Sequence, residues 1–222
     1  MTRVVVKCGD AVADNAAEAI LALAATGAEV CVVHGAGPQI SAEMRRFHVP
    51  ITFVDGRRVT SPAALMLVRR SLAAVNRSLC TALGARAVGL LGDEIGLEAT
   101  PVPALGLVGE PMPSRPPAVA SALAAGKIPV VAPLATGPLN VNADEAAAAL
   151  AIGLGADRLL FVTDVPGLLL GGSVVESIRV READRLLTDG RLEGGIVPKL
   201  HAAVRAAKVG VRAEIGETAV LA

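Results

Sequence analysis

Leu139-Asn140-Val141-Asn142-Ala143-Asp144 is followed by an alanine-rich run that extends from Glu145 to Ala156. The run consists of strong helix formers, and either Asn142 or Asp144 can serve as its N-cap, so we expect an irregular polar loop that enters a helix. Two amides and a carboxylate directly before an almost wholly apolar helix act either as caps or as ligands for a polar molecule. Three other places have a matching character: Lys7-Cys8-Gly9-Asp10, His34-Gly35-Ala36-Gly37 and Pro198-Lys199. We expect all four places to meet at one site.

The composition indicates a chain with a large core and argues against several classes of protein. Its 222 residues are 53% hydrophobic and suffice for one compact domain or two closely packed lobes, and no apolar run approaches the length of a membrane span. Basic and acidic residues balance at 21 each, and Trp and Tyr are absent, which argues against nucleic acid or an anionic membrane as partner. The chain enters a strand at once, without a signal peptide, and three cysteines without CxxC spacing indicate reduced thiols, so we expect a cytoplasmic protein.

Apolar runs rich in β-branched residues alternate with helical patterns along the chain. Buried strands are expected at 3–7, 29–33, 86–91, 128–132 and 158–163, and helices at 15–26, 39–47, 62–83, 117–125, 181–188 and 197–209. The remaining segments predict a hairpin that begins at 51, a loop at 92–103, edge strands within 105–113, a hinge at 133–138 and closing strands at 211–215 and 219–221. This alternation predicts an α/β fold, a three-layer sandwich with a mainly parallel central sheet and two lobes.

The second expected strand runs straight into a glycine loop and a helix. Val33 is followed by His34-Gly35-Ala36-Gly37, and Pro38 suits the first position of the next helix. Phosphates favour this geometry, because free backbone N–H groups and the helix dipole face the anion. The loop is neither a Walker A loop nor GxGxxG, so a purely structural turn explains its glycines equally well.

The charged candidates each have a plain structural alternative. Only four basic residues are lysines, which directs attention to Lys7 at a strand end and Lys199 in the first turn of a helix. Either could be a solvated edge residue, although a cation near a helix N-terminus opposes the dipole unless an anion lies between them. Asp144 taken alone is more simply an N-cap, and Asp164 could equally be a turn residue.

Other polar residues give weaker signals. Arg57 and Arg58 could be a solvated hairpin end, or one of them could grip a carboxylate. His34 is better explained as a buried structural histidine than as a base, and Cys8 and Cys31 as small core residues. No cluster has the spacing of transition-metal ligands, so we predict no protein-held metal.

Taken together and in order, the chain resembles the amino acid kinase family, and within it most closely the acetylglutamate kinases. The resemblance spans nearly the whole chain, and its strongest part is the combination of GRRVT, NVNAD and GGIVPK. The matching stretches are VVVKCG, VVHGAGPQIS, DGRRVT, LAAVNRSL, AVGLLG, LGLVGE, GKIPVVAPLATG, LNVNADEAAAAL, LLFVTDVPGLL and LEGGIVPKLHAA.

The resemblance implies transfer of the γ-phosphoryl group of ATP to the side-chain carboxylate of N-acetyl-L-glutamate, with Mg²⁺ carried on the phosphates. A carboxylate is already ionised at pH 7, so this chemistry requires no general base. It requires two anions to be held in line and the charge on the transferring group to be neutralised. The resemblance also implies an N-lobe (1–133) for amino-acid binding and dimerisation, a C-lobe (134–222) for ATP, and a homodimer.

The same resemblance assigns roles to particular residues. Lys7 and Lys199 would stabilise the transition state, and Asp144 would hold both lysines. Arg58 would pair with the α-carboxylate of the substrate, while the remaining substrate-binding positions would be Ala36, Gly37, Asn140 and Asn142. The segments 164–169 and 191–193 would line the nucleotide site. That site would include Gly9, Asp10, Gly35, Asp164, Val165, Gly167, Leu168 and Leu192.

The chain departs from the family pattern in four places. The family usually has two glycines after the strand-end lysine, and Gly9-Asp10 reflects either replacement of the second glycine or a one-residue deletion that puts Asp10 where Asn often stands. A carboxylate there would repel phosphate unless it is turned away or bridged by Mg²⁺. Ala36 replaces the middle glycine of a triplet, which is tolerable only at negative φ. The segment after Leu91 and the C-terminus are both short. These departures leave two alternatives open: a kinase for another small acceptor (carrier-linked aminoadipate or glutamate, or carbamate), and a catalytically impaired relative that binds nucleotide or amino acid.

Overall fold

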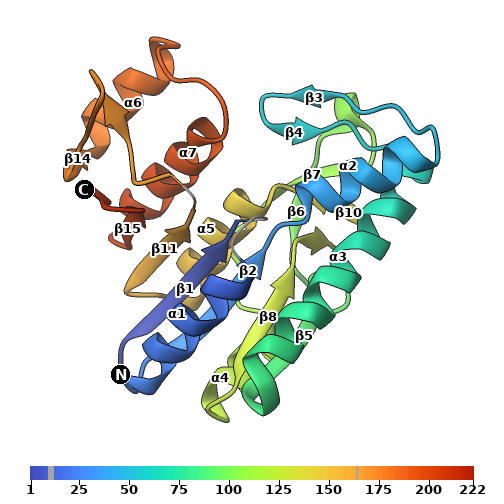
Figure 1. The fold of residues 1–222 in the computed structure, drawn as a ribbon, viewed down its shortest axis with the longest axis horizontal. Helices are drawn as coiled ribbons and strands as arrows, with labels where there is room; N and C mark the ends of the chain where they lie inside the picture. The colour runs from blue at the N-terminus through green and yellow to red at the C-terminus, as the bar shows by residue number, and fades with distance from the viewer. Residues whose placement is uncertain (10–12, 164) are drawn as a thin grey trace.

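The structure is a computed structural model that describes residues 1–9, 13–163 and 165–222. Its largest feature is an eight-stranded sheet in which every neighbouring pair is parallel except β15 and β16 (Figure 1). From one edge to the other the strands are β14 (Ser177–Arg179), β16 (Thr218–Leu221), β15 (Arg212–Ile215), β11 (Arg158–Val162), β1 (Arg3–Cys8), β2 (Glu29–His34), β8 (Ile128–Ala132) and β5 (Ala87–Leu91).

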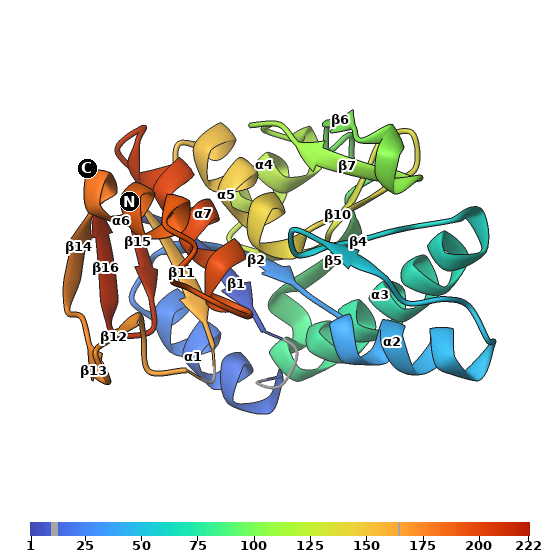
Figure 2. The same cartoon turned by 90° about the horizontal axis from the view of Figure 1, so that it is seen from above.

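Helices cover both faces of this sheet, which gives three layers (Figure 2). One face carries α1 (Ala13–Ala25) and α3 (Pro62–Leu83), and the other carries α4 (Pro117–Ala124), α5 (Ala143–Leu154) and α7 (Ile196–Ala207). Two further helices pack on this framework: α2 (Gly37–Arg46) lies on α3, and α6 (Val180–Thr188) lies on α7. The predicted three-layer α/β sandwich with a mainly parallel sheet is confirmed.

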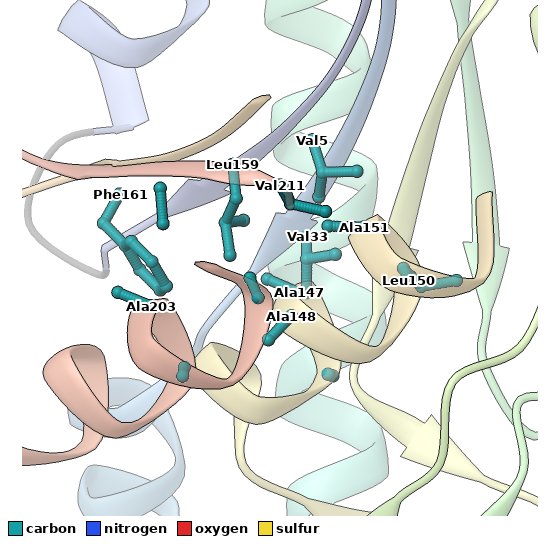
Figure 3. Close-up of a cluster of buried hydrophobic side chains, with 14 of the residues drawn as sticks. Val5, Val33, Ala147, Ala148, Leu150, Ala151, Leu159, Phe161, Ala203 and Val211 are labelled. Carbon is teal, nitrogen blue, oxygen red and sulfur yellow. The ribbon is translucent and has the colours of Figure 1, made fainter. Parts of the chain in front are cut away.

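Strand β1 shows why the central strands read as continuous apolar runs. Val5 points into the core beneath α5, whereas Val4 and Val6 point into the core beneath α1 and α3. All three are at most 2% exposed, because helices cover both faces of the strand. On the α5 side, Val5, Val33 and Leu159 gather against alanines of α5 and α7 (Figure 3). Short alanine side chains let α5 pack closely against the sheet and against α7, which lies beside it on the same face.

Smaller strand pairs surround the carboxyl edge of the sheet. A second sheet has the order β6 (Ala99–Pro101), β7 (Val108–Pro111), β10 (Leu139–Val141) and β9 (Leu134–Ala135). One hairpin joins β3 (Phe53–Val54) to β4 (Arg57–Arg58), and another joins β12 (Leu169–Leu170) to β13 (Ser173–Val174). Short 3₁₀ turns occupy Gly84–Arg86 and Pro103–Leu105.

Four local expectations were wrong. The irregular loop expected before α5 is strand β10, because Asn140 and Val141 pair in parallel with β7. Strand β5 was expected to be buried, but it is the edge strand of the large sheet and none of its residues is fully buried. The hinge expected at 133–138 contains strand β9, and the loop expected at 92–103 contains strand β6.

The large sheet draws four strands from residues 1–133 and four from 134–222. The short strands β9 and β10, at 134–141, pair with each other and with β7. The division of function between an N-lobe and a C-lobe stays a prediction. Within the residues that the structure describes, no helix has both the length and the apolar character needed to cross a membrane.

Candidate active site

At the carboxyl end of β1, the helices that connect neighbouring strands change from one face of the sheet to the other. From β1 the chain passes through α1 to β2, whereas β11, on the other side of β1, is reached through α5 on the opposite face. Ligands of open α/β sheets bind in the crevice outside such a switch point. Lys7 of β1 and His34 of β2 lie at this edge.

Two lysines and one aspartate form the charged centre of the crevice. Lys7 Nζ lies 3.1 Å from Asp144 Oδ1, and Lys199 Nζ lies 3.6 Å from Asp144 Oδ2. The three side chains are between 6% and 14% exposed. A buried carboxylate between two ammonium groups leaves one net positive charge, and an anion can approach it.

The N-terminus of α5 places Asp144 at this point. Asn142 is the N-cap, and its Oδ1 accepts hydrogen bonds from the amides of Asp144 (2.8 Å) and Glu145 (3.2 Å). The cap role left open for Asp144 therefore belongs to Asn142. Asp144 sits in the first helical turn, where the helix dipole favours a carboxylate.

A cavity of about 250 Å³ opens between Lys7, Lys199 and the β3–β4 hairpin. Nine predicted site residues line it: Lys7, Gly35, Ala36, Gly37, Arg58, Asn140, Asn142, Asp144 and Lys199. The sequence did not single out Phe53, Leu72 and Val108, which also line it. Of these three, only Phe53 could have been connected to the site in advance, because it lies in the predicted hairpin with Arg58; the structure pairs the two residues directly.

Arg58 is held rigidly at one side of this cavity. Its Nη2 donates to Ser41 Oγ (2.9 Å) and to the carbonyl of Gly37 (3.3 Å), and its guanidinium lies 4.5 Å from the centre of the Phe53 ring. The residue is only 6% exposed. A planar, pre-oriented guanidinium suits recognition of a carboxylate.

Asn140 belongs to the same hydrogen-bonded chain. Its Nδ2 donates to Thr60 Oγ1 (3.0 Å), and the Thr60 hydroxyl donates to the carbonyl of Arg58 (2.7 Å). Thr60 is fully buried, so this chain fixes the orientation of the Asn140 amide relative to the Arg58 backbone. The sequence alone gave no reason to connect these three residues.

The two glycine loops that follow β1 and β2 differ in detail from the expectation that their amides are free to bind phosphate. The amide of Gly9 donates to Val162 (3.1 Å) and the amide of Gly35 to Cys8 (3.3 Å), so these two predicted donors are already used within the sheet. At the start of α2, by contrast, no described residue accepts from the amides of Gly37 and Gln39. Helix N-termini bind anions through such amides.

Ala36 meets the condition set by the sequence. Its φ of −158° is negative, so a side chain is accommodated where the family pattern has glycine. Ala36 is 2% exposed and packs with Ile40 and Met44 in the core between α2 and α3.

A second cavity of about 470 Å³ adjoins the first, and both are lined by Gly195 and Lys199. Its walls include the predicted nucleotide-binding residues Val165, Gly167, Leu168 and Leu192, together with 191–193. Leu169 belongs to the predicted segment 164–169, whereas the sequence did not single out Ile196, and both residues add apolar surface. The predicted residues Asp10 and Asp164 lie outside the described residues.

The histidine and cysteine candidates are buried, which favours structural roles for them. His34 is 2% exposed, and its Nε2 lies 3.1 Å from Asn76 Nδ2. Burial raises the pKa of Cys8 and of Cys31 to about 12, so both thiols are protonated at neutral pH and are poor nucleophiles. Among the described residues, no group of three metal-ligating side chains could hold a metal ion.

The fold and this centre define an α/β protein with a positively charged crevice at the carboxyl edge of its sheet. The chain belongs to the amino acid kinase family, whose sequence profile matches residues 2–216. An acetylglutamate kinase of Rubrobacter xylanophilus is 42% identical over 97% of this chain and 88% of its own length. An acetylglutamate kinase of Geobacillus stearothermophilus is 40% identical over 91% of this chain and 84% of its own length.

Solved structures share the fold. The Streptococcus mutans protein smu.665 superposes with a TM-score of 0.88 at 27% identity, covering 99% of this chain and 98% of that one. An N-acetylglutamate synthase of Neisseria gonorrhoeae superposes with a TM-score of 0.85 at 20% identity, covering all of this chain and 59% of that one. A carbamate kinase of Giardia lamblia superposes with a TM-score of 0.75 at 16% identity, covering 99% of this chain and 98% of that one.

Proposed function

We propose that the protein transfers the γ-phosphoryl group of ATP to the side-chain carboxylate of N-acetyl-L-glutamate, forming N-acetyl-L-glutamyl 5-phosphate for arginine biosynthesis. The observation that carries the proposal is the pair of adjoining cavities that share Lys199, with Lys199 and Lys7 both held by Asp144. One cavity suits a small acid and the other a nucleotide. Relatives named acetylglutamate kinase, which are 42% and 40% identical to this chain, support the choice of acceptor.

In this proposal the chain positions two anions and stabilises charge. The acceptor carboxylate is the nucleophile, the bond from the γ-phosphorus to the bridging oxygen of ADP breaks, and no proton has to be removed. Lys7 and Lys199 attract the oxygens of the transferring group, and Asp144 fixes both ammonium groups beforehand, so little reorganisation is needed. The amides of Gly37 and Gln39 are suitable further donors. When bound to the phosphates, Mg²⁺ supplies additional charge neutralisation.

The small cavity determines the acceptor. Arg58 pairs with the α-carboxylate, and Asn140 with the backbone of Ala36 and Gly37 holds the acetamido group. This leaves the side-chain carboxylate directed at the lysine pair. The ordering of Arg58 by Ser41 and Phe53 favours one bound orientation.

Hydroxylamine trapping tests the reaction directly, because it converts an acyl phosphate into a hydroxamate, which forms a coloured complex with ferric iron. Purified protein, ATP and Mg²⁺ are incubated with N-acetyl-L-glutamate, N-acetyl-aminoadipate, free glutamate, carbamate or no acceptor, and Lys199→Ala serves as the inactive control. Hydroxamate that depends on N-acetyl-L-glutamate supports the proposal. Product with another acceptor, and none with this one, overturns the substrate. No product with any acceptor despite nucleotide binding points to a sensor.

Two further expectations belong to this proposal. We propose that 1–133 binds the amino acid and provides the dimer contact, that 134–222 binds ATP, and that the protein is a homodimer. Light scattering after size exclusion measures the mass directly, and a monomer of 22.4 kDa would overturn the dimer.

A further inference from the structure

Arg57 and Arg58 are successive residues of β4, and their guanidinium groups lie on opposite sides of the hairpin. Arg58 points to α2, as described above. Arg57 instead meets Glu145 in the first turn of α5, with Nε 2.9 Å from Oε1. Its Nη2 also lies 3.4 Å from Oε2 of Glu110 on β7.

The hairpin has little apolar packing to hold it in place. Each strand has only two residues, and Phe53 and Val54 are 53% and 43% exposed. Asp55 and Gly56 have φ of +48° and +75°, which is typical of the tight turn that shapes a hairpin. An isolated two-stranded hairpin is marginal in water, so its position depends on its ties to neighbouring elements.

A second tie ends on the same turn of α5. Asn142 Nδ2 donates to the carbonyl of Gly56 (3.3 Å), while the Oδ1 of the same side chain caps α5. Asp144, which holds both lysines, lies between Asn142 and Glu145. The turn that organises the lysine pair is therefore also the turn to which the hairpin is tied.

The Arg57–Glu145 contact is stronger than an ordinary surface pair. The two side chains are 22% and 17% exposed, so water screens them only partly. Burial alone lowers the pKa of the Arg57 guanidinium, but hydrogen bonding and charge attraction from Glu145 and Glu110 outweigh it and the pKa is raised. Glu145 Oε2 is buried and no described group donates a hydrogen bond to it, so without Arg57 this carboxylate would stay poorly compensated.

We propose that Arg57 is a positioning residue for acceptor binding: by tying the β3–β4 hairpin to the first turn of α5, it sets where Arg58 meets the substrate carboxylate. The inference rests on the proposed function for the identity of the acceptor. Arg57 itself acts through the hairpin, and its second partner Glu110 is 54% exposed and contributes less.

The test compares Arg57→Ala with Arg3→Ala, a matched control at the opposite end of the sheet. Arg3 pairs with Glu29 at 2.7 Å, and those side chains are 24% and 18% exposed, close to the values for Arg57 and Glu145. Loss of a charged hydrogen bond predicts that Arg57→Ala raises the acceptor KM about tenfold while kcat and the ATP KM change by less than about threefold. Arg57→Lys should recover part of the loss, and Arg3→Ala should leave the acceptor KM unchanged.

Hydrogen exchange supplies a readout that does not depend on turnover. Peptides covering residues 51–60 should exchange faster in Arg57→Ala than in the wild type, and at the wild-type rate in Arg3→Ala. An unchanged acceptor KM in an active enzyme, or unchanged exchange in the hairpin, overturns the inference and leaves the proposed function intact. A wild type inactive with every acceptor overturns the proposed function, and hairpin exchange then decides the inference by itself.

Discussion

The substitution Asp144→Asn removes the charge shared by Lys7 and Lys199 while keeping the shape of the side chain. The carboxylate lies 3.1 and 3.6 Å from the two ammonium groups. At an effective dielectric constant of about 20, two unit charges at about 3 Å attract by about 5 kcal/mol. Desolvation offsets part of that attraction, and removing one partner of a buried ion pair typically destabilises by about 3–5 kcal/mol.

We expect Asp144→Asn to lower the free energy of unfolding by about 3 kcal/mol, the low end of that range. The reason is that Lys199 is 14% exposed and can turn its ammonium group toward the open side of the cavity. Turnover should fall by about 10²-fold or more, because the two cations lose the group that orients them before reaction.

Urea denaturation followed by far-ultraviolet circular dichroism measures the stability, since the chain has no Trp or Tyr for intrinsic fluorescence. Hydroxamate formation measures the turnover. The double variant Lys7→Met/Asp144→Asn has one unpaired buried cation fewer than Asp144→Asn alone. It should therefore regain part of the lost stability, and it should stay inactive. A stability loss below about 1 kcal/mol with turnover within about tenfold of the wild type would refute the reasoning.

Three further predictions concern Arg58, Gly153 and the buried cysteines. Arg58→Ala should raise the acceptor KM by about 10- to 100-fold with little change in the ATP KM, and steady-state kinetics showing an effect on ATP alone would reverse the assignment of the two cavities. Gly153→Ala should destabilise by about 2 kcal/mol or more, measured as a lower urea midpoint, because a Cβ there would lie 2.0 Å from the Ser114 carbonyl; an unchanged midpoint would contradict this. Cys8 and Cys31 should resist an aromatic disulfide reagent at pH 8 and react after denaturation, because pKa values of about 12 leave about one thiol in ten thousand ionised; rapid labelling of the native protein at either site would show accessible thiolates.

Much of the framework follows from local sequence. Ser61 caps α3 through a hydrogen bond from the amide of Ala64 (3.2 Å), and the adjacent Pro62 suits the first position, so the start of this helix is written in consecutive residues. The apolar run 4–6 is buried on both faces of the sheet and could be identified as part of a central strand from its residue types alone.

The local pattern failed where pairing with a distant partner decided the structure. Residues 139–141 are too few to show a strand period, and they became β10 because β7 lies alongside. The amides of Gly9 and Gly35 looked available in sequence, yet both donate within the large sheet. Neither outcome could be predicted locally, because a backbone hydrogen bond depends on which strand arrives next to it.

The sequence by itself determined the fold class, the elements that carry the site and the kinds of side chain that gather there. Only the tertiary structure decided how they divide the work. Asn142 and Asp144 are equivalent cap candidates in sequence, and the difference arises because lysines from β1 and α7 converge on Asp144. Arg57 and Arg58 are equally ambiguous in sequence, and their roles separate because strand pleating sends one guanidinium to α5 and the other to α2. Local propensity fixes where a residue sits along the chain, whereas the charge and hydrogen bonding that give it a role come from segments the chain brings together only on folding.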